Sequence, residues 1–141
     1  MVLIMEYAET DILQFLYNVD ADFNPPLSSK VVLNEYVSKI ISKAELIVRG
    51  DSGGIFGMVI LYANDICSRS AYISLVGVKS TYRGRGVATD MMREAIAIAK
   101  DKGMARIGIH SNNNIAIELY KSIGFVVKTD DERKYMEYEI K

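Results

Sequence analysis

The chain has 141 residues, which favours a single domain over 1–141, and its 50% hydrophobic and 25% charged content excludes a disordered chain. Its 17 basic and 18 acidic residues leave a net charge of −1, so neither nucleic acid nor a membrane surface is an expected partner, because both need a basic excess. One cysteine, Cys67, excludes an internal disulfide, and the apolar run Val2–Met5 stops too soon for a signal peptide, so a cytoplasmic location is expected.

The first part of the chain predicts two helices separated by a loop. An apolar stripe at helical spacing predicts a helix from Thr10 to Asp20, with Thr10 as its cap. The segment Ala21–Ser28 carries both prolines of the chain and predicts a loop. A second stripe predicts a helix that begins at Ser29, again a capping residue, and ends near Lys43.

Three strands are predicted next. Ala44–Arg49 and Ile55–Ala63 are short apolar runs joined by the turn signal Gly50–Gly54, a pattern typical of a hairpin. After a polar turn over Asn64–Ser70, the run Ala71–Val78 predicts the third strand.

The rest of the chain alternates helices and strands. The pattern predicts a long helix over Gly86–Lys102, a strand over Ala105–His110, and a helix capped by Asn113 or Asn114.

Two last strands, Phe125–Lys128 and Tyr135–Ile140, surround the polar turn Thr129–Lys134. The whole order predicts an α/β fold of the mixed α+β kind, in which about four helices cover the faces of a mixed, twisted sheet.

The turn Arg83–Ala88 lies between the predicted strand Ala71–Val78 and the long helix, and its sequence predicts an anion site. The first backbone amides of a helix have no partner inside the helix, and its dipole favours negative charge there. Gly84 and Gly86 let a phosphate approach the main chain, and Arg83 and Arg85 add cations with a fork geometry suited to phosphate. We therefore expect a pyrophosphate ligand.

Two kinds of pyrophosphate ligand fit poorly. A mononucleotide P-loop needs Lys and Ser or Thr after its last glycine, whereas Val87 and Ala88 follow Gly86. A dinucleotide fingerprint needs a third Gly or Ala where Thr89 stands, and a carboxylate at the end of the next strand, which ends in His110.

The third ligand is coenzyme A, and here two motifs carry a family resemblance. Arg83-x-x-Gly86-x-Ala88 lies between a strand and a helix, and Asn113-x-x-Ala116-x-x-Leu119-Tyr120-x-x-x-Gly124-Phe125 follows it. Together they resemble the GNAT-type N-acetyltransferases, which use acetyl-CoA. The motifs cover Tyr72 to Phe125, and the order of elements extends the resemblance over nearly the whole chain.

The resemblance implies a mostly antiparallel central sheet whose middle strands splay to admit the pantetheine arm. Backbone groups of Val76 and Val78, on either side of Gly77, would pair with that arm, and the amide of Val76 would face the thioester carbonyl as an oxyanion donor. Tyr120 would protonate the departing thiolate as general acid. The implied catalytic residues are Tyr120 and Val76; the implied cofactor-binding residues are Val76, Gly77, Val78, Arg83, Gly84, Arg85, Gly86, Val87, Ala88, Thr89, Asn113 and Tyr120, with no metal.

Plainer interpretations stay open for several of these residues. Arg83 and Arg85 could be solvated charges, Asn113 a helix cap, and Tyr120 a packed ring. His110, the only histidine, is attractive as a general base, but the sequence favours a structural or partly exposed side chain.

The chain departs from the family pattern in one respect. Many members carry a carboxylate on the strand facing the amine, but the corresponding positions here are Tyr72 and Ser74. The candidate bases Asp20, Asp22 and Glu35 belong to no motif, so no base is assigned.

We therefore expect an enzyme that transfers acetyl from acetyl-CoA to a primary amine by direct attack, because no Cys–His nucleophile pair is evident. The acceptor would be a small-molecule or protein amine, and a homodimer is possible in this fold. A non-catalytic acyl-CoA-binding module on the same scaffold is the alternative.

Overall fold

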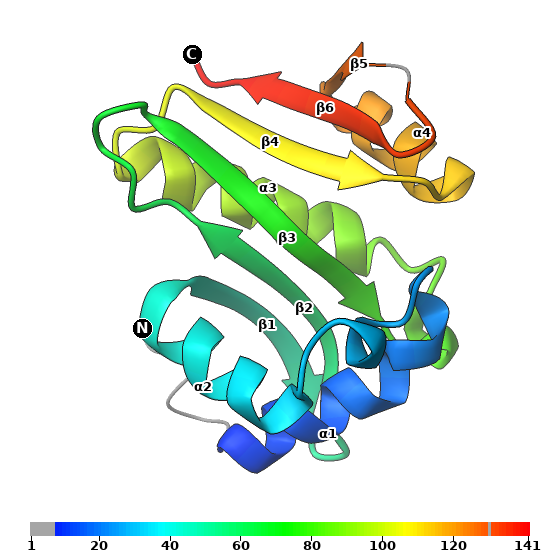
Figure 1. Cartoon of the computed structure of the whole chain (residues 1–141). Coiled ribbons are helices and arrows are strands. Elements are labelled where there is room, and N and C mark those ends of the chain that lie inside the picture. The colour runs from blue at the N-terminus through cyan, green and yellow to red at the C-terminus, as the bar shows by residue number, and fades with distance from the viewer. Residues whose placement is uncertain (1–7, 130) are drawn as a thin grey trace.

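One sheet of six strands runs through the molecule, with helices on both faces (Figure 1). The computed structural model describes residues 8–129 and 131–141, so the run Val2–Met5 lies outside the described residues. The strands lie in the order β1–β2–β3–β4–β6–β5. Their bounds are β1 Glu45–Asp51, β2 Gly54–Tyr62, β3 Ser70–Val78, β4 Arg106–Ser111, β5 Val126–Thr129 and β6 Lys134–Glu139.

Two pairs of helices cover opposite faces of this sheet. Helices α1 (Glu9–Val19) and α2 (Leu33–Lys43) pack in front of β1 and β2, whereas α3 (Val87–Asp101) and α4 (Asn114–Ile123) lie behind the sheet (Figure 1). Among the described residues, no helix combines the length and the apolar character needed to cross a membrane. The front of β4 and β6 carries no helix; we call the front of β3, β4 and β6 the open face.

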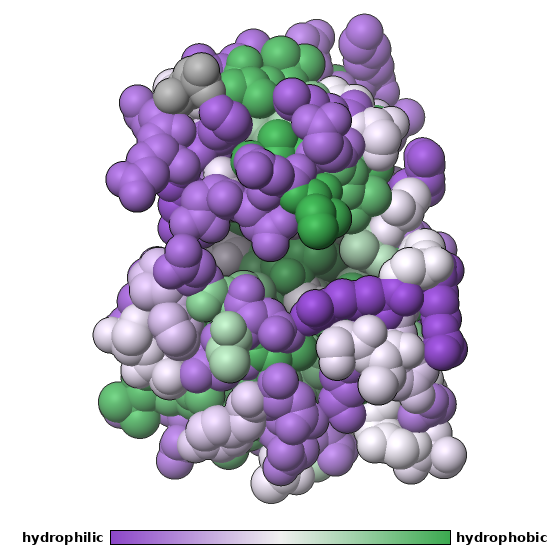
Figure 2. Space-filling view, turned by 90° about the vertical axis from the view of Figure 1, so that its right-hand side faces the viewer, coloured by the Kyte–Doolittle hydropathy of each residue, from purple (hydrophilic) through white to green (hydrophobic). Residues whose placement is uncertain are grey.

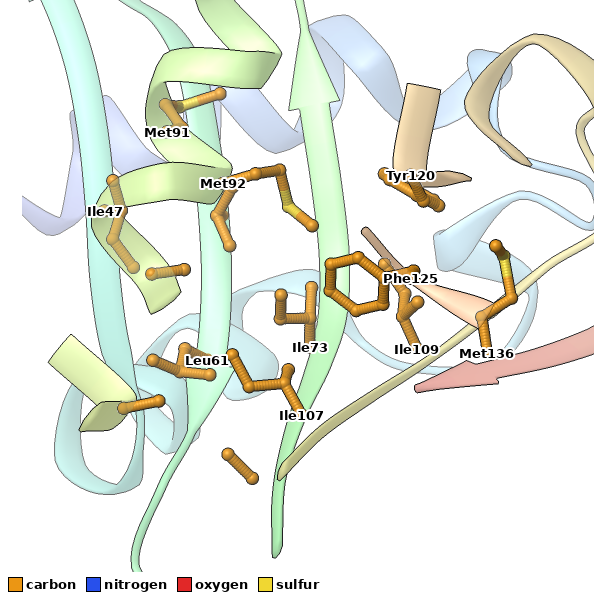
Figure 3. Close-up of a cluster of buried hydrophobic side chains, with 14 of the residues drawn as sticks. Ile47, Leu61, Ile73, Met91, Met92, Ile107, Ile109, Tyr120, Phe125 and Met136 are labelled. Atoms are coloured by element: carbon orange, nitrogen blue, oxygen red, sulfur yellow. The ribbon is translucent and has the colours of Figure 1, made fainter. Parts of the chain in front are cut away.

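Each pair of helices closes over its own buried cluster. Behind the sheet, Met91 and Met92 of α3 belong to one cluster with Ile73 and Ile107 of the middle strands, and this cluster continues to Tyr120 on α4 (Figure 3). In front, Phe15 of α1 belongs to a second cluster with side chains of α2 and β2. The sheet therefore separates two cores, and β2 contributes side chains to both of them.

The predicted starts of the first two helices are wrong. Helix α1 begins at Glu9, and the amide of Ala8 donates to the carboxylate of Asp11 at 2.9 Å, so Thr10 is inside the helix and caps nothing. Helix α2 begins only at Leu33. Ser29 lies in a short 3₁₀ turn, Leu27–Ser29, where its hydroxyl donates to the carbonyl of Pro26 at 2.6 Å and is not free to cap.

The predicted fold class is confirmed, and so is the splay of the middle strands. Most strand pairs are antiparallel; β3 and β4 are parallel and pair only from Ser70–Arg106 to Ile73–Ile109. Beyond Ile73 the register of β3 against β2 shifts, so that Ser74 is an extra residue, a β-bulge. A bulge bends its strand, and from Ser74 to Val78 strand β3 leaves β4.

Candidate active site

The gap between β3 and β4 exposes backbone groups that have no strand partner. The amide of Lys79 donates to the carbonyl of Phe56 at 2.8 Å. Because bonded and non-bonded pairs alternate in an antiparallel ladder, Leu75 and Gly77 also bond to β2, and the backbone groups of Val76 and Val78 point away from it, into the gap. These are the groups predicted to bind the pantetheine arm.

The Gly-rich turn lies at the end of β3 and opens helix α3. Gly84 and Gly86 have φ angles of 76° and 79°, a left-handed conformation that side chains disfavour, and a Cβ on either would meet no atom within 4 Å. Gly86 is the N-cap of α3, and no side chain that the structure describes bonds to the first amides of the helix. The amides of Val87 and Ala88 are therefore available to an anion.

The two arginines of the turn point elsewhere. Nε of Arg83 donates to the carbonyl of Val78 at 3.0 Å, and its Nη2 lies 2.6 Å from Oδ2 of Asp22. The guanidinium of Arg85 lies 5.2 Å from the centre of the Tyr82 ring. In this arrangement both guanidinium groups have partners within the protein, so the free groups of the turn are its backbone amides, and the phosphate roles of both side chains stay predictions.

A cavity of about 640 Å³ joins the gap to the turn. Such a volume is typical of a small-molecule site. In Figure 2 this side of the molecule is hollowed between an upper and a lower half, with hydrophobic atoms in the hollow and hydrophilic atoms on its rim. Every predicted cofactor residue except Arg85 lines the cavity. The α1–α2 connection forms one wall, and the side-chain Nδ2 of Asn112 donates to the backbone carbonyl of Asn24 in this connection at 3.1 Å.

Tyr120 reaches this cavity from α4. Its ring is only 5% exposed and lies 6.0 Å from that of Phe125, centre to centre, at one end of the buried cluster (Figure 3). Burial raises the pKa of Tyr120 to about 12, so the phenol is protonated near neutral pH. Within residues 8–129 and 131–141 its hydroxyl has no hydrogen-bond partner, and it is therefore free to donate to a ligand.

Asn113 is the cap of α4, and it is one of the two positions predicted for that cap. Its Oδ1 accepts from the amide of Ala116 at 3.0 Å, and its own amide donates to Oγ of Ser111 at 3.2 Å. Asn113 lines the cavity, and its Nδ2 group, which the cap does not use, can donate to a ligand there.

A polar cluster lies on the open face, beside the point where the strands separate. The hydroxyl of Tyr72 lies 2.8 Å from Nδ1 of His110, and the His110 ring packs against Tyr135 with 4.8 Å between ring centres. The hydroxyl of Tyr135 donates to Oε2 of Glu137 at 2.9 Å. Burial, followed by the charge of Arg133, lowers the pKa of His110, so its imidazole is neutral at pH 7.

Sequence reasoning did not find this cluster, although His110 was among its candidates. Tyr72 and His110 are far apart in the chain and meet only because β3 and β4 pair in parallel. The candidate carboxylates are engaged or distant. Asp20 accepts from the amide and hydroxyl of Ser28, Asp22 binds Arg83, and Glu35 does not line the cavity.

A strand gap next to uncapped helix amides, with a phenol on one side and a neutral imidazole on the other, defines the class of acyl-CoA-binding transferase folds. The sequence profile of the acetyltransferase (GNAT) family matches residues 13–125. The chain belongs to this family, which confirms the resemblance that its two motifs indicate.

Two curated relatives illustrate the sequence similarity. The chain is 42% identical over 57 residues to GCN5-related N-acetyltransferase 4, chloroplastic, of Arabidopsis thaliana, covering 39% of this chain and 20% of the relative. It is 38% identical over 74 residues to the probable N-acetyltransferase san of Drosophila melanogaster, covering 50% and 40%. The chain thus spans less than half the length of these relatives.

Solved structures show the same fold. Ard1 of Thermoplasma volcanium superposes with a TM-score of 0.77 at 18% identity, covering 96% of this chain and 95% of the other. PaiA N-acetyltransferase of Thermoplasma acidophilum, a complex with coenzyme A, gives 0.75 at 15% identity, covering 93% and 92%. Among the described residues, no group of His, Cys, Asp and Glu could hold a metal ion.

Proposed function

We propose that the protein transfers the acetyl group of acetyl-CoA to a primary amine by direct attack. The observation that carries this proposal is the continuity of the strand gap with the amides of Gly86–Ala88 in one cavity. Those amides would hold the diphosphate, and the backbone edge of β3 that faces the gap would bind the pantetheine arm as an added strand. The acyl end would then reach the amide of Val76, directed into the gap to stabilise the oxyanion.

The two proton transfers of the reaction would take place on opposite faces of the sheet. The amine would enter from the open face, where Nε2 of His110 takes the proton that the nitrogen loses as the new C–N bond forms. On the other face, Tyr120 donates to the sulfur as the C–S bond breaks. Nδ1–H of His110 would donate to the oxygen of Tyr72, which orients the ring and stabilises the imidazolium.

Burial of Tyr120 sets a limit on its role. Its pKa of about 12 lies above that of an ordinary thiol, about 8.5, so complete proton transfer to a free thiolate costs about 5 kcal/mol. Tyr120 therefore acts best as a hydrogen-bond donor to the sulfur while the C–S bond breaks, with the proton following late.

Direct attack is favoured over an acyl-enzyme by the position of the one cysteine. Cys67 is exposed in the turn before β3 and does not line the cavity. No other thiol is present in the sequence. Thr89, a hydroxyl side chain of the cavity wall, has no hydrogen bond to a base among the described residues, so nothing activates it as a nucleophile.

The alternative is a non-catalytic acyl-CoA-binding module, favoured by the lack of a free carboxylate on the described cavity wall. Release of free thiol from acetyl-CoA over a panel of amines decides between the two. Binding is measured separately as the rise in Tm with acetyl-CoA, with NAD as the control ligand. Binding without turnover of any amine would support the module; no binding would reject both proposals.

A further inference from the structure

Arg133 is a cation at the amine side of the cavity. It lies in the bend directly before β6, is exposed, and lines the cavity. Within the described part of the chain it has no ion-pair or hydrogen-bond partner. Burial raises the pKa of Tyr72, and the positive charge of Arg133 partly offsets this rise. Burial lowers the pKa of His110, and the same charge lowers it further. The guanidinium of Arg133 is therefore close to both side chains.

This position is far from the expected phosphates. Tyr72 precedes Val78 by six positions in β3, a separation of about 20 Å at ~3.3 Å per residue. The Gly-rich turn follows Val78. The part of the cavity wall that carries Arg133 and His110 therefore lies beyond the acyl end of the pantetheine arm, where the acceptor must enter.

The other charges of the cavity wall strengthen the positive field. Lys30, in the α1–α2 connection, also lines the cavity and has no ion-pair partner among the described residues. Asp22 is the one carboxylate on the described wall, and Arg83 neutralises it. On the open face, Glu137 is outside the cavity wall and accepts from Tyr135.

From this arrangement, and resting on the proposed function, we propose that the acceptor is an amine with a carboxylate close to its nitrogen, and that Arg133 binds this carboxylate while His110 meets the amine. The planar fork of an arginine suits a carboxylate. Lys30 adds attraction from the facing wall. Polycationic amines are poor acceptors, because they meet two cations and no free carboxylate.

The test uses acceptor pairs that differ by one carboxylate, at pH 8, where His110 is neutral with or without Arg133, and kcat/KM is calculated for the unprotonated amine of each member. One pair is a free amino acid and its amide; the other is a peptide with Glu or Gln in second position, so the two pairs distinguish a small acceptor from a peptide N-terminus. We expect kcat/KM to favour the carboxylate member by about tenfold to a hundredfold. Arg133→Gln should abolish that preference and leave the KM for acetyl-CoA unchanged.

Arg93→Gln is the matched control, because Arg93 is exposed on α3 and does not line the cavity. A higher kcat/KM for a polyamine or for the neutral member of both pairs would overturn the inference, as would an equal loss for both members in Arg133→Gln. Binding of the same pairs to protein saturated with CoA gives a readout without turnover. A carboxylate preference in binding with no thiol release would reject the proposed transfer and support the anion site.

Discussion

The hydroxyl of Tyr72 lies 2.8 Å from Nδ1 of His110, and this hydrogen bond joins β3 to β4 near the last paired residues before the strands separate. Tyr72 holds the imidazole at the mouth of the gap. With the proton on Nδ1, the lone pair of Nε2 is free for the amine.

Removal of the imidazole should lower kcat. For His110→Gln we expect a decrease on the order of 10²-fold with little change in acetyl-CoA affinity, since the side chain acts only on the amine. Steady-state kinetics and calorimetric titration of acetyl-CoA check this. Tyr72→Phe should give a smaller decrease, because it only removes the acceptor for Nδ1–H; if it had the larger effect, Tyr72 rather than His110 would be the base.

The acid limb of the pH–rate profile should shift when Arg133 is neutralised. Burial and the Arg133 charge both lower the pKa of His110, so the wild-type imidazole becomes protonated only below its ordinary pKa of 6.5. Arg133→Gln removes the repulsion, the pKa rises, and activity should begin to fall at a higher pH. The measurement is kcat against pH with one saturating acceptor, compared with Arg93→Gln. A shift to lower pH would contradict the assignment.

Loss of the phenol on the other face should affect chemistry and spare binding. Tyr120→Phe is expected to lower kcat on the order of 10²-fold while acetyl-CoA affinity stays within about twofold. Because burial raises the pKa of Tyr120 to about 12, activity should not decline through ionisation of this residue below pH ~11. Tyr17→Phe, an exposed tyrosine of α1, is the control; equal kcat in both variants would remove Tyr120 from the mechanism.

Substitutions at two glycines distinguish the effect of backbone strain on stability from the effect of a lost contact on cofactor affinity. Gly86 and Gly103 have φ angles of 79° and 81°, and a Cβ on either would meet open space. Gly86→Ala and Gly103→Ala should therefore lose similar stability, about 1–2 kcal/mol. Only Gly86→Ala should weaken acetyl-CoA, because its Cβ would lie in the anion site. Thermal unfolding and calorimetry check the two effects, and a matched loss of affinity in Gly103→Ala would attribute both to strain.

The pair between Asp22 and Arg83 should oppose cofactor binding slightly. Asp22→Asn removes a negative charge from the cavity wall and releases Arg83 toward the phosphates, so we expect the Kd for CoA to fall several-fold, less so at high salt. Both partners are substantially exposed, so stability should change by less than about 1 kcal/mol. Asp131→Asn, outside the cavity wall, is the control. Weaker CoA binding in Asp22→Asn would mean that the pair positions the wall.

Local patterns in the sequence were sufficient to predict the helices, the strands and the Gly-rich turn, but they could not predict which strands pair. The 3.6-residue and two-residue periods identify all four helices and six strands, and glycine spacing marks the anion site. The caps at Thr10 and Ser29 were wrong, because the carboxylate of Asp11 binds the amide at the actual start of the first helix and the carbonyl of Pro26 takes the hydroxyl of Ser29. The partners of Arg83 and His110 depend on contacts between distant segments, which no local period records.

Ser74, the extra residue of β3, interrupts the strand pairing and so lowers the stability of the sheet. Without this extra residue, β3 would run straight and could pair with β4 along its whole length. The backbone groups that now face the gap would then bond to β4 and could not bind a ligand. Selection for stability alone would tend to delete this defect, and an acetyl-CoA enzyme built on this sheet must keep it. Deletion of Ser74 should therefore raise the free energy of unfolding and close the gap between β3 and β4.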